Sequence, residues 1–284
     1  MPEGNTIHRF ARSHTRDFGG RIVRVSSPQG RFAAEAKRLD RRRFLRAEAY
    51  GKHLFHFWEG GLIVHVHLGM AGWFYRHKHT GRAPEPKPSV RMRLSRRDLT
   101  VDLIGPPTCE LLSSPAQVQA VLDRLGPDPL RPDADPERVW AELRRRRRPI
   151  GDALLDQRVI SGVGNIYRNE ALFLSGIHPL RRSDRLAEAE WRELWTTTAR
   201  LMRRGLRPGS IATVDPREPL APGARSGRAA KDAFYVYQEE VCRRCGRALR
   251  EFPLSGRRMW VCRSCQPYRR RVPAAGMRLA PTSS

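Results

Sequence analysis

Two pairs of cysteines near the C-terminus have the spacing of a metal site. Two residues separate Cys242 from Cys245 and Cys262 from Cys265, and sixteen residues lie between the pairs. Four thiolates at this spacing are typical of a tetrahedral zinc site with no open coordination position. We therefore predict one structural Zn²⁺ with no catalytic role. A disulfide pairing is disfavoured, because the chain has no secretory signal and a reducing compartment keeps thiols free.

The N-terminal sequence Met1-Pro2-Glu3-Gly4 offers a nucleophile beside an acid. Removal of the initiator methionine would leave Pro2 with a free secondary amine, and α-amino groups titrate near about pH 8. Such an amine can attack a sugar carbon C1′ and form a cationic iminium, with Glu3 as the candidate general acid. Taken alone, the motif also fits an ordinary chain start.

The charge of the chain indicates a polyanionic partner. The sequence has 54 basic and 29 acidic residues, a formal net charge of +25, and only five of the basic residues are lysines. The excess is +11 over residues 1–125 and +14 over residues 126–284, so it is not confined to a tail. No apolar run approaches the roughly 20 residues of a membrane span, and the N-terminus has no signal-peptide core. We expect a cytoplasmic protein that binds nucleic acid and no membrane.

The spacing of apolar residues changes along the chain, and it predicts the helices and strands that must position these groups. Residues 5–18 have helical spacing, and strand-like runs follow up to about residue 103. Further helices are predicted beyond residue 115, and a tight turn at Ser255-Gly256 predicts a β-hairpin between the cysteine pairs. The strands are expected at 21–25, 44–49, 53–58, 62–68, 90–94 and 99–103, and the later helices at 115–125, 135–143, 150–160, 165–174 and 184–204.

These patterns predict an α+β, multidomain chain. Residues 1–125 are expected to form an N-terminal domain with a leading helix and a β-sandwich, for which a barrel is the alternative, and residues 126–232 a helical domain that ends in a long loop at 206–232. A zinc-bound β-hairpin at 233–270 and a flexible tail at 271–284 complete the expected organisation.

Several motifs occur together in an order that resembles the formamidopyrimidine-DNA glycosylase and endonuclease VIII family of base-excision repair enzymes. The resemblance runs from residue 1 to about 268 and is strongest to an actinobacterial endonuclease VIII. It implies a helix–two-turn–helix motif in the helical domain. The motifs lie at 1–4, 51–53, 155–157 and 162–167 and in the terminal cysteine hairpin.

The resemblance also implies catalytic roles. Pro2 would be the Schiff-base nucleophile, and Glu3 would protonate the deoxyribose ring oxygen. Lys52 would contact phosphate and assist β-elimination. Arg257, five residues before Cys262, would grip the phosphates beside the lesion and assist δ-elimination.

Further residues match DNA-contacting positions of the family. Asn165 lies in the turn before a helix, where glycines let backbone amides approach phosphate. Arg124 matches another DNA contact, and Met70 matches a residue that wedges into the duplex once the base has flipped out. Thr6 stands where many relatives carry a second glutamate. The Arg-Phe wedge of the formamidopyrimidine branch is absent from 104–109, which favours the endonuclease VIII branch.

Two other features have more than one interpretation. His65 and His67 form an H-x-H pair that could be a second metal site, but packing is favoured because no carboxylate lies nearby in the sequence. The arginine run 144–148 is typical of a solvated charged surface, and a non-specific phosphate role also fits it.

We therefore predict a bifunctional DNA glycosylase and AP lyase that acts on double-stranded DNA with an oxidised base or an abasic site. The expected substrate is an oxidised pyrimidine, removed through an imine at Pro2 and followed by β,δ-elimination. The alternatives are an oxidised-purine glycosylase and a non-catalytic zinc-hairpin protein that binds damaged DNA. A monomer, associated with the bacterial nucleoid through DNA binding, is expected.

Overall fold

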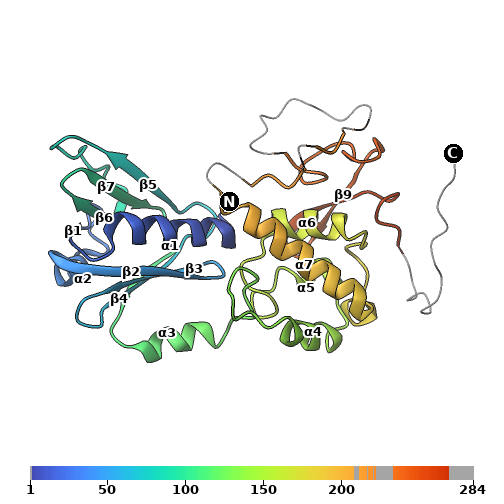
Figure 1. Ribbon diagram of the computed structural model, residues 1–284, viewed down its shortest axis with the longest axis horizontal. Coiled ribbons are helices and arrows are strands. Elements are labelled where there is room, and N and C mark those ends of the chain that lie inside the picture. The colour runs from blue at the N-terminus through green and yellow to red at the C-terminus, as the bar shows by residue number, and fades with distance from the viewer. Residues whose placement is uncertain (1, 208–210, 216, 220, 222–232, 269–284) are drawn as a thin grey trace. The chain divides into compact units, whose positions relative to one another are not determined.

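The computed structural model describes all of the chain except residues 1, 208–210, 216, 220, 222–232 and 269–284 (Figure 1). It contains two compact units. The first comprises residues 1–134, 160–164 and 202–209, and the second comprises 135–159, 165–201 and 210–284. The domain boundaries expected at residues 125, 232 and 270 stay a prediction, and the expected tail lies outside the described residues.

An antiparallel sheet of eight strands, in the order β5-β7-β6-β1-β2-β3-β4-β8, forms most of the first unit. Strand β1 joins two layers, because residues 21–23 pair with β2 whereas residues 24–26 pair with β6. The predicted β-sandwich is thereby confirmed. The strands are β1 (Arg21–Ser26), β2 (Arg42–Tyr50), β3 (His53–Trp58), β4 (Ile63–His67), β5 (Trp73–Lys78), β6 (Val90–Arg96), β7 (Leu99–Ile104) and β8 (Thr108–Leu112).

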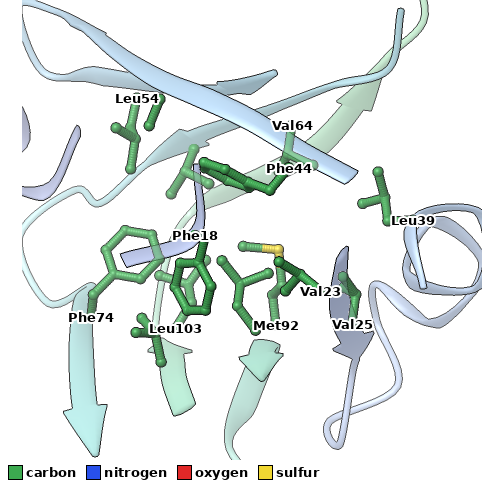
Figure 2. Packing of buried hydrophobic residues seen from close by; sticks show 14 of the residues in the cluster. Phe18, Val23, Val25, Leu39, Phe44, Leu54, Val64, Phe74, Met92 and Leu103 are labelled. Carbon is green, nitrogen blue, oxygen red and sulfur yellow. The ribbon is translucent and has the colours of Figure 1, made fainter. Parts of the chain in front are cut away.

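The core of the first unit lies between these layers. Figure 2 shows Phe18, Phe44 and Met92 pointing into the same space, and all three are fully buried. Phe18 comes from the leading helix α1 (Gly4–Phe18), so burial of its apolar face fixes this helix against the strands. The core thereby holds the start of α1, where Glu3 is the N-cap residue.

Three elements of the first unit were missed in the sequence. They are the short helix α2 (Ala33–Leu39) and the strands β5 and β8. Strand β8 has only one buried residue and no clear alternation, so its extended form depends on pairing with the edge of β4. Another helix of this unit, α3 (Pro115–Leu122), is three residues shorter than expected.

The second unit contains most of the remaining helices. Asp135 caps the first of them by accepting hydrogen bonds from the backbone N–H groups of Glu137 and Arg138. The helices are α4 (Pro136–Arg144), α5 (Ile150–Ala153), α6 (Asn165–Leu174), the 3₁₀ turn η1 (Ser183–Arg185) and α7 (Glu188–Arg204), whose last residues belong to the first unit. No helix among the described residues is long and apolar enough to cross a membrane.

The predicted helix at 150–160 is wrong beyond Ala153. The Asp156 carboxylate accepts a hydrogen bond of 3.0 Å from the Arg158 N–H and holds the Arg148 guanidinium at 2.8 Å. A local side-chain bond to the backbone competes with helix formation, so the chain turns here instead. Two turns therefore lie between α5 and α6.

The predicted β-hairpin is present as β9 (Arg250–Leu254) and β10 (Arg257–Val261). Ser255 and Gly256 form its two-residue turn with φ values of 55° and 68°. Positive φ at both positions gives a turn whose twist matches that of the flanking strands. Trp260 from β10 and Phe173 from α6 belong to one apolar cluster that also contains Cys242 and Cys262.

Candidate functional site

The N-terminal Pro2-Glu3 pair lies in a buried, tightly packed corner of the first unit. The Glu3 side chain is fully buried, and its Oε2 accepts a hydrogen bond of 2.9 Å from the Gly164 N–H. The Gly4 N–H donates to the Gly162 carbonyl at 2.8 Å. The turn at 162–164 therefore holds both the carboxylate and the backbone beside it. This arrangement gives Glu3 one fixed position, as a general acid requires.

Glycine is required at two positions of this turn. A Cβ on Gly164 would lie 2.3 Å from Glu3 Cδ, closer than any side chain can approach. Gly162 has a φ of +87°, which strains other residues, and its added Cβ would lie 3.4 Å from Gly51 Cα. These glycines were expected to let backbone amides approach phosphate, but the Gly164 N–H is engaged by Glu3.

The Gly51-Lys52 turn is fixed by Asp128, a residue that was not predicted from the sequence. Buried Asp128 accepts hydrogen bonds from the Gly51 N–H at 2.7 Å and the Leu130 N–H at 2.9 Å. The same carboxylate lies 2.6 Å from His8 Nε2 on α1. Asp128 thus connects the turn that carries Lys52 to the helix that follows Glu3. The sequence feature that could have indicated this role is the aspartate in the Gly-Pro-Asp-Pro turn.

Two other predicted DNA contacts lie at the surface of the first unit. Met70 follows β4 and is 63% exposed, which suits a residue that inserts into a duplex. Arg124 is exposed and donates to the Ala120 carbonyl at 3.0 Å. Its charge and that of Lys52 both lower the pKa of His53, so the two cations lie near this ring. Thr6, where the sequence resemblance places a second glutamate, is buried on α1.

Histidines 53, 65 and 67 gather on β3 and β4 beside Lys52. His53 Nδ1 lies 2.9 Å from His65 Nε2, and His65 Nδ1 lies 2.8 Å from Glu110 Oε1. Burial is the largest cause of the lowered pKa of all three rings, and the pKa of His53 falls to about 3. The carboxylate partner comes from β8, a strand that the sequence did not reveal.

In the second unit, Asn165 begins α6, and its side chain contacts the hairpin. Its Nδ2 donates to the Arg258 carbonyl at 3.1 Å, and its Oδ1 accepts from Arg168 at 2.5 Å. The fully buried Arg168 guanidinium also donates to the Gly151 carbonyl at 3.1 Å and the Leu254 carbonyl at 3.4 Å. These contacts fix the hairpin against α5 and α6.

Arg257 lies next to the hairpin turn, at the start of β10, and is exposed. Its neighbour Arg258 is also exposed and forms an ion pair with Glu251 at 3.2 Å. A second hairpin contact holds β10, because the Trp260 N–H donates to Asn169 Oδ1 at 2.8 Å. The hairpin therefore presents Arg257 on a backbone anchored to α6.

Buried Glu170 has no counterpart among the predicted site residues. Its oxygens accept hydrogen bonds from three successive backbone N–H groups, at Tyr235, Val236 and Tyr237, and from the Thr213 hydroxyl. Burial raises the pKa of this carboxyl, although the four donors oppose that effect. The signal in the sequence was a run of polar residues, R-N-E, inside a helix that is otherwise apolar.

The four predicted cysteine ligands converge. Their sulfur atoms all lie within 4.8 Å of one another, with Cys242 to Cys265 at 3.9 Å and Cys245 to Cys262 at 3.5 Å. A tetrahedral ion with metal–sulfur bonds of about 2.3 Å places its ligands about 3.8 Å apart. The four thiols therefore fit one tetrahedral metal ion. Among the described residues, no other group of three or more His, Cys, Asp or Glu side chains converges in this way.

The structure thus brings the predicted residues together in two groups. Pro2, Glu3 and Lys52 lie on segments of the first unit that meet at Gly162. Asn165, Arg257 and the four cysteines belong to the second unit.

Comparisons with known proteins match two regions of the chain to domains of one enzyme. The N-terminal domain of formamidopyrimidine-DNA glycosylase matches residues 1–103, and the helix–two-turn–helix (H2TH) domain of the same enzyme matches residues 125–215. Endonuclease 8 1 of Mycobacterium tuberculosis is 46% identical over 270 residues, which cover 94% of this chain and 100% of the relative. Formamidopyrimidine-DNA glycosylase of Thermomicrobium roseum is 32% identical over 82% of this chain and 84% of its own length.

Solved structures show the same fold. Lactococcus lactis formamidopyrimidine-DNA glycosylase, bound to DNA containing an abasic site, has a TM-score of 0.75 at 22% identity, with 94% of this chain and 100% of that chain covered. The sheet domain, the H2TH region and the cysteine hairpin define a DNA repair glycosylase. The chain belongs to the formamidopyrimidine-DNA glycosylase and endonuclease VIII family, whose members are DNA glycosylases with AP lyase activity. Its higher identity to the mycobacterial endonuclease 8 supports the endonuclease VIII branch.

Proposed function

We propose that this enzyme removes oxidised pyrimidines from double-stranded DNA through a Schiff base at Pro2 and then cleaves the strand by β,δ-elimination. The observation that carries the proposal is the buried Glu3 carboxylate. Glu3 directly follows Pro2 in the chain, and its carboxylate accepts a hydrogen bond from the Gly164 N–H. A secondary amine and a positioned acid are the two groups that imine formation at C1′ needs.

The reaction begins when the unprotonated Pro2 nitrogen attacks C1′ of the damaged nucleotide. The base leaves with the electron pair of the C1′–N bond and takes up the proton that the Pro2 nitrogen loses once it is bonded to C1′. The lone pair that this leaves on the nitrogen then expels the ring oxygen, to which Glu3 donates a proton as the sugar opens, and the product is a cationic iminium at C1′. Burial keeps the Glu3 carboxyl away from bulk water during this step.

The iminium acts as an electron sink for strand cleavage. Loss of a proton from C2′ expels the 3′ phosphate, and a second elimination expels the 5′ phosphate, which leaves a one-nucleotide gap. Lys52 is proposed to bind phosphate and assist the first elimination. Arg257, exposed beside the hairpin turn, is proposed to bind the flanking phosphates and assist the second.

DNA binding is supported by the net charge of +25 and by relatives solved with DNA that contains abasic sites or damaged bases. We propose that Met70, Arg124 and Asn165 contribute contacts. The Asn165 side chain already bonds to the hairpin and to Arg168, so its proposed DNA contact uses backbone at the N-terminus of α6.

The metal at the four cysteines is proposed to be Zn²⁺. Their four sulfurs fill a tetrahedral shell, so the ion would hold β9 and β10 in place without an open position for substrate. Burial raises the pKa of Cys242 to about 11 in the absence of metal. Metal binding therefore releases protons and should strengthen as the pH rises.

The test is excision from duplexes that contain either thymine glycol or 8-oxoguanine. We expect faster excision of the pyrimidine, and we expect that the double variant Pro2→Gly, Glu3→Gln loses excision of both. Faster excision of 8-oxoguanine would instead favour the purine alternative. Undiminished activity in the double variant would contradict the Pro2 mechanism.

A further inference from the structure

A hydrogen-bonded row of side chains crosses three adjacent strands of the first unit. It runs from Glu110 on β8 through His65 on β4 to His53 on β3, with contacts of 2.8 Å and 2.9 Å. The two ends of the row reach the surface: the Glu110 side chain is 53% exposed and His53 is partly exposed, whereas His65 between them is 6% exposed. The row has no part in the chemistry assigned to Pro2 and Glu3.

The row is not a chelate for one metal ion. His65 uses Nδ1 toward Glu110 and Nε2 toward His53, and these nitrogens lie on opposite sides of the ring. A single ion can bind only one of them. Because both nitrogens of His65 are engaged in the row, none is left for a metal ion shared with His67, which disfavours the metal interpretation of the H-x-H pair.

The row fixes which nitrogens carry protons. Ionised Glu110 can only accept, so His65 Nδ1 carries the hydrogen and its Nε2 is left as an acceptor. His53 must then donate from Nδ1, which leaves a bare lone pair on its Nε2. Within the described residues, this Nε2 makes no hydrogen bond and is not a buried unpartnered atom.

The open end of the row lies among proposed DNA contacts. Lys52 and Arg124 both act electrostatically on His53, and the ring of His67 lies 4.9 Å away between centroids. On the other flank, Tyr50 of β2 is the residue opposite His53. Among the described residues, the charged and titratable groups around this ring therefore include two cations, two histidines, Tyr50 and the remote Glu110.

We propose that His53 is a further phosphate-binding residue of the DNA site, and that it takes up a proton at Nε2 when the phosphate binds. This proposal rests on the proposed function, which brings DNA to Lys52 and Arg124. A bare lone pair repels a phosphate oxygen, whereas a protonated Nε2 donates a hydrogen bond to it. His65 and Glu110 then stabilise the imidazolium from behind.

The proton comes from solvent, so proton uptake by His53 makes DNA affinity depend on pH. In the free protein the pKa of His53 is about 3, lowered mainly by burial and further by neighbouring positive charge. A phosphate a few ångströms away raises such a pKa by about 1–3 units. Because the complex binds more protons than the free protein, DNA affinity should rise as the pH falls below about 6.

The experiment measures affinity for a duplex with a tetrahydrofuran abasic-site analogue between pH 5.0 and 8.0 at constant ionic strength. The variant His53→Gln keeps a donor toward His65 but cannot titrate. We expect the wild type to gain about three- to tenfold more affinity than His53→Gln on going from pH 7.5 to 5.0, up to tenfold per pH unit for one proton. An equal gain in both proteins would overturn the proposal.

Two further variants separate the row from general effects. Glu110→Gln keeps an acceptor for His65 but removes the charge, so the pH-dependent gain should shift to lower pH. His79→Gln, which changes a histidine bonded to Thr100 on another part of the sheet, should match the wild type. Loss of the gain in His79→Gln or its persistence unchanged in Glu110→Gln would also contradict the proposal.

Failure of the proposed function and failure of the His53 proposal give different results. If the wild type binds no DNA at any pH, both proposals fall. If it binds and excises normally while His53→Gln shows the wild-type pH dependence, only the role of His53 is refuted. Calorimetry at pH 6 in two buffers of different ionisation enthalpy should show proton uptake in the wild type and less in His53→Gln.

Discussion

Replacing Glu170 by glutamine should loosen the second unit by a predictable amount. One oxygen, Oε1, accepts from the N–H groups of Val236 and Tyr237, both at 2.9 Å. The other, Oε2, accepts from the Tyr235 N–H at 2.8 Å and from the Thr213 hydroxyl. If the glutamine NH₂ group takes the position of Oε1, it faces two backbone N–H donors. If it takes the position of Oε2, it faces only the Tyr235 N–H, because the Thr213 hydroxyl can rotate and accept a hydrogen bond from the NH₂ group.

The better orientation therefore still leaves one buried N–H unpaired, that of Tyr235. This result does not depend on whether Glu170 is ionised, since a protonated carboxyl also satisfies that donor. An unpaired buried N–H costs about 1–3 kcal/mol. If the segment opens locally, exchange of the amide hydrogens at 235–237 should accelerate by about 5- to 150-fold, the same free energy expressed as an equilibrium constant.

Hydrogen exchange followed by mass spectrometry measures this effect. Glu142→Gln provides the control, because Glu142 lies on α4 and forms partly exposed ion pairs with Arg145 and Arg146. Such pairs contribute little, about 0–1 kcal/mol, and the control should leave exchange at 235–237 unchanged. Unchanged protection in Glu170→Gln would show that this carboxyl does not anchor the segment.

Three other changes have defined outcomes. Gly164→Ala should displace the Glu3 carboxylate, because the added Cβ would lie 2.3 Å from its Cδ; excision should fall at least about tenfold, and wild-type excision would contradict the assigned geometry. The His14–His56 pair is buried and the pKa of His14 is lowered to about 4 by desolvation, against an ordinary 6.5. Unfolding free energy should therefore decline as the pH falls from 6.5 to 4, on the order of 3 kcal/mol from His14, and urea midpoints that stay flat over this range would argue against it. Cys262→Ser should release the metal and weaken DNA binding, and wild-type affinity would show that the hairpin does not contact DNA.

Sequence patterns predicted the parts of the fold that local chemistry determines. The cysteine spacing and the Ser255-Gly256 turn specify a hairpin through coordination and backbone conformation, so both could be identified without neighbours. The leading helix could also be predicted, from its apolar stripe. Strand β8 could not be predicted because its conformation depends on pairing with β4, which is remote in sequence.

The same distinction applies to the site. Pro2 and Glu3 could be proposed from their types alone, but the partner of Glu3 is a backbone N–H at residue 164. Asp128 and Glu110 were missed because their roles arise from hydrogen bonds to segments 77 and 45 residues away. Such contacts exist only once the sheet has formed.

The proposed mechanism depends on formation of the covalent intermediate at the Pro2 amine. Borohydride reduction during reaction with abasic-site DNA, followed by peptide mapping, tests it most directly. We expect a protein that lacks Met1 and carries one reduced sugar adduct on the N-terminal peptide, at the nitrogen of Pro2. An intact Met1, or an adduct located on a lysine such as Lys52, would contradict it.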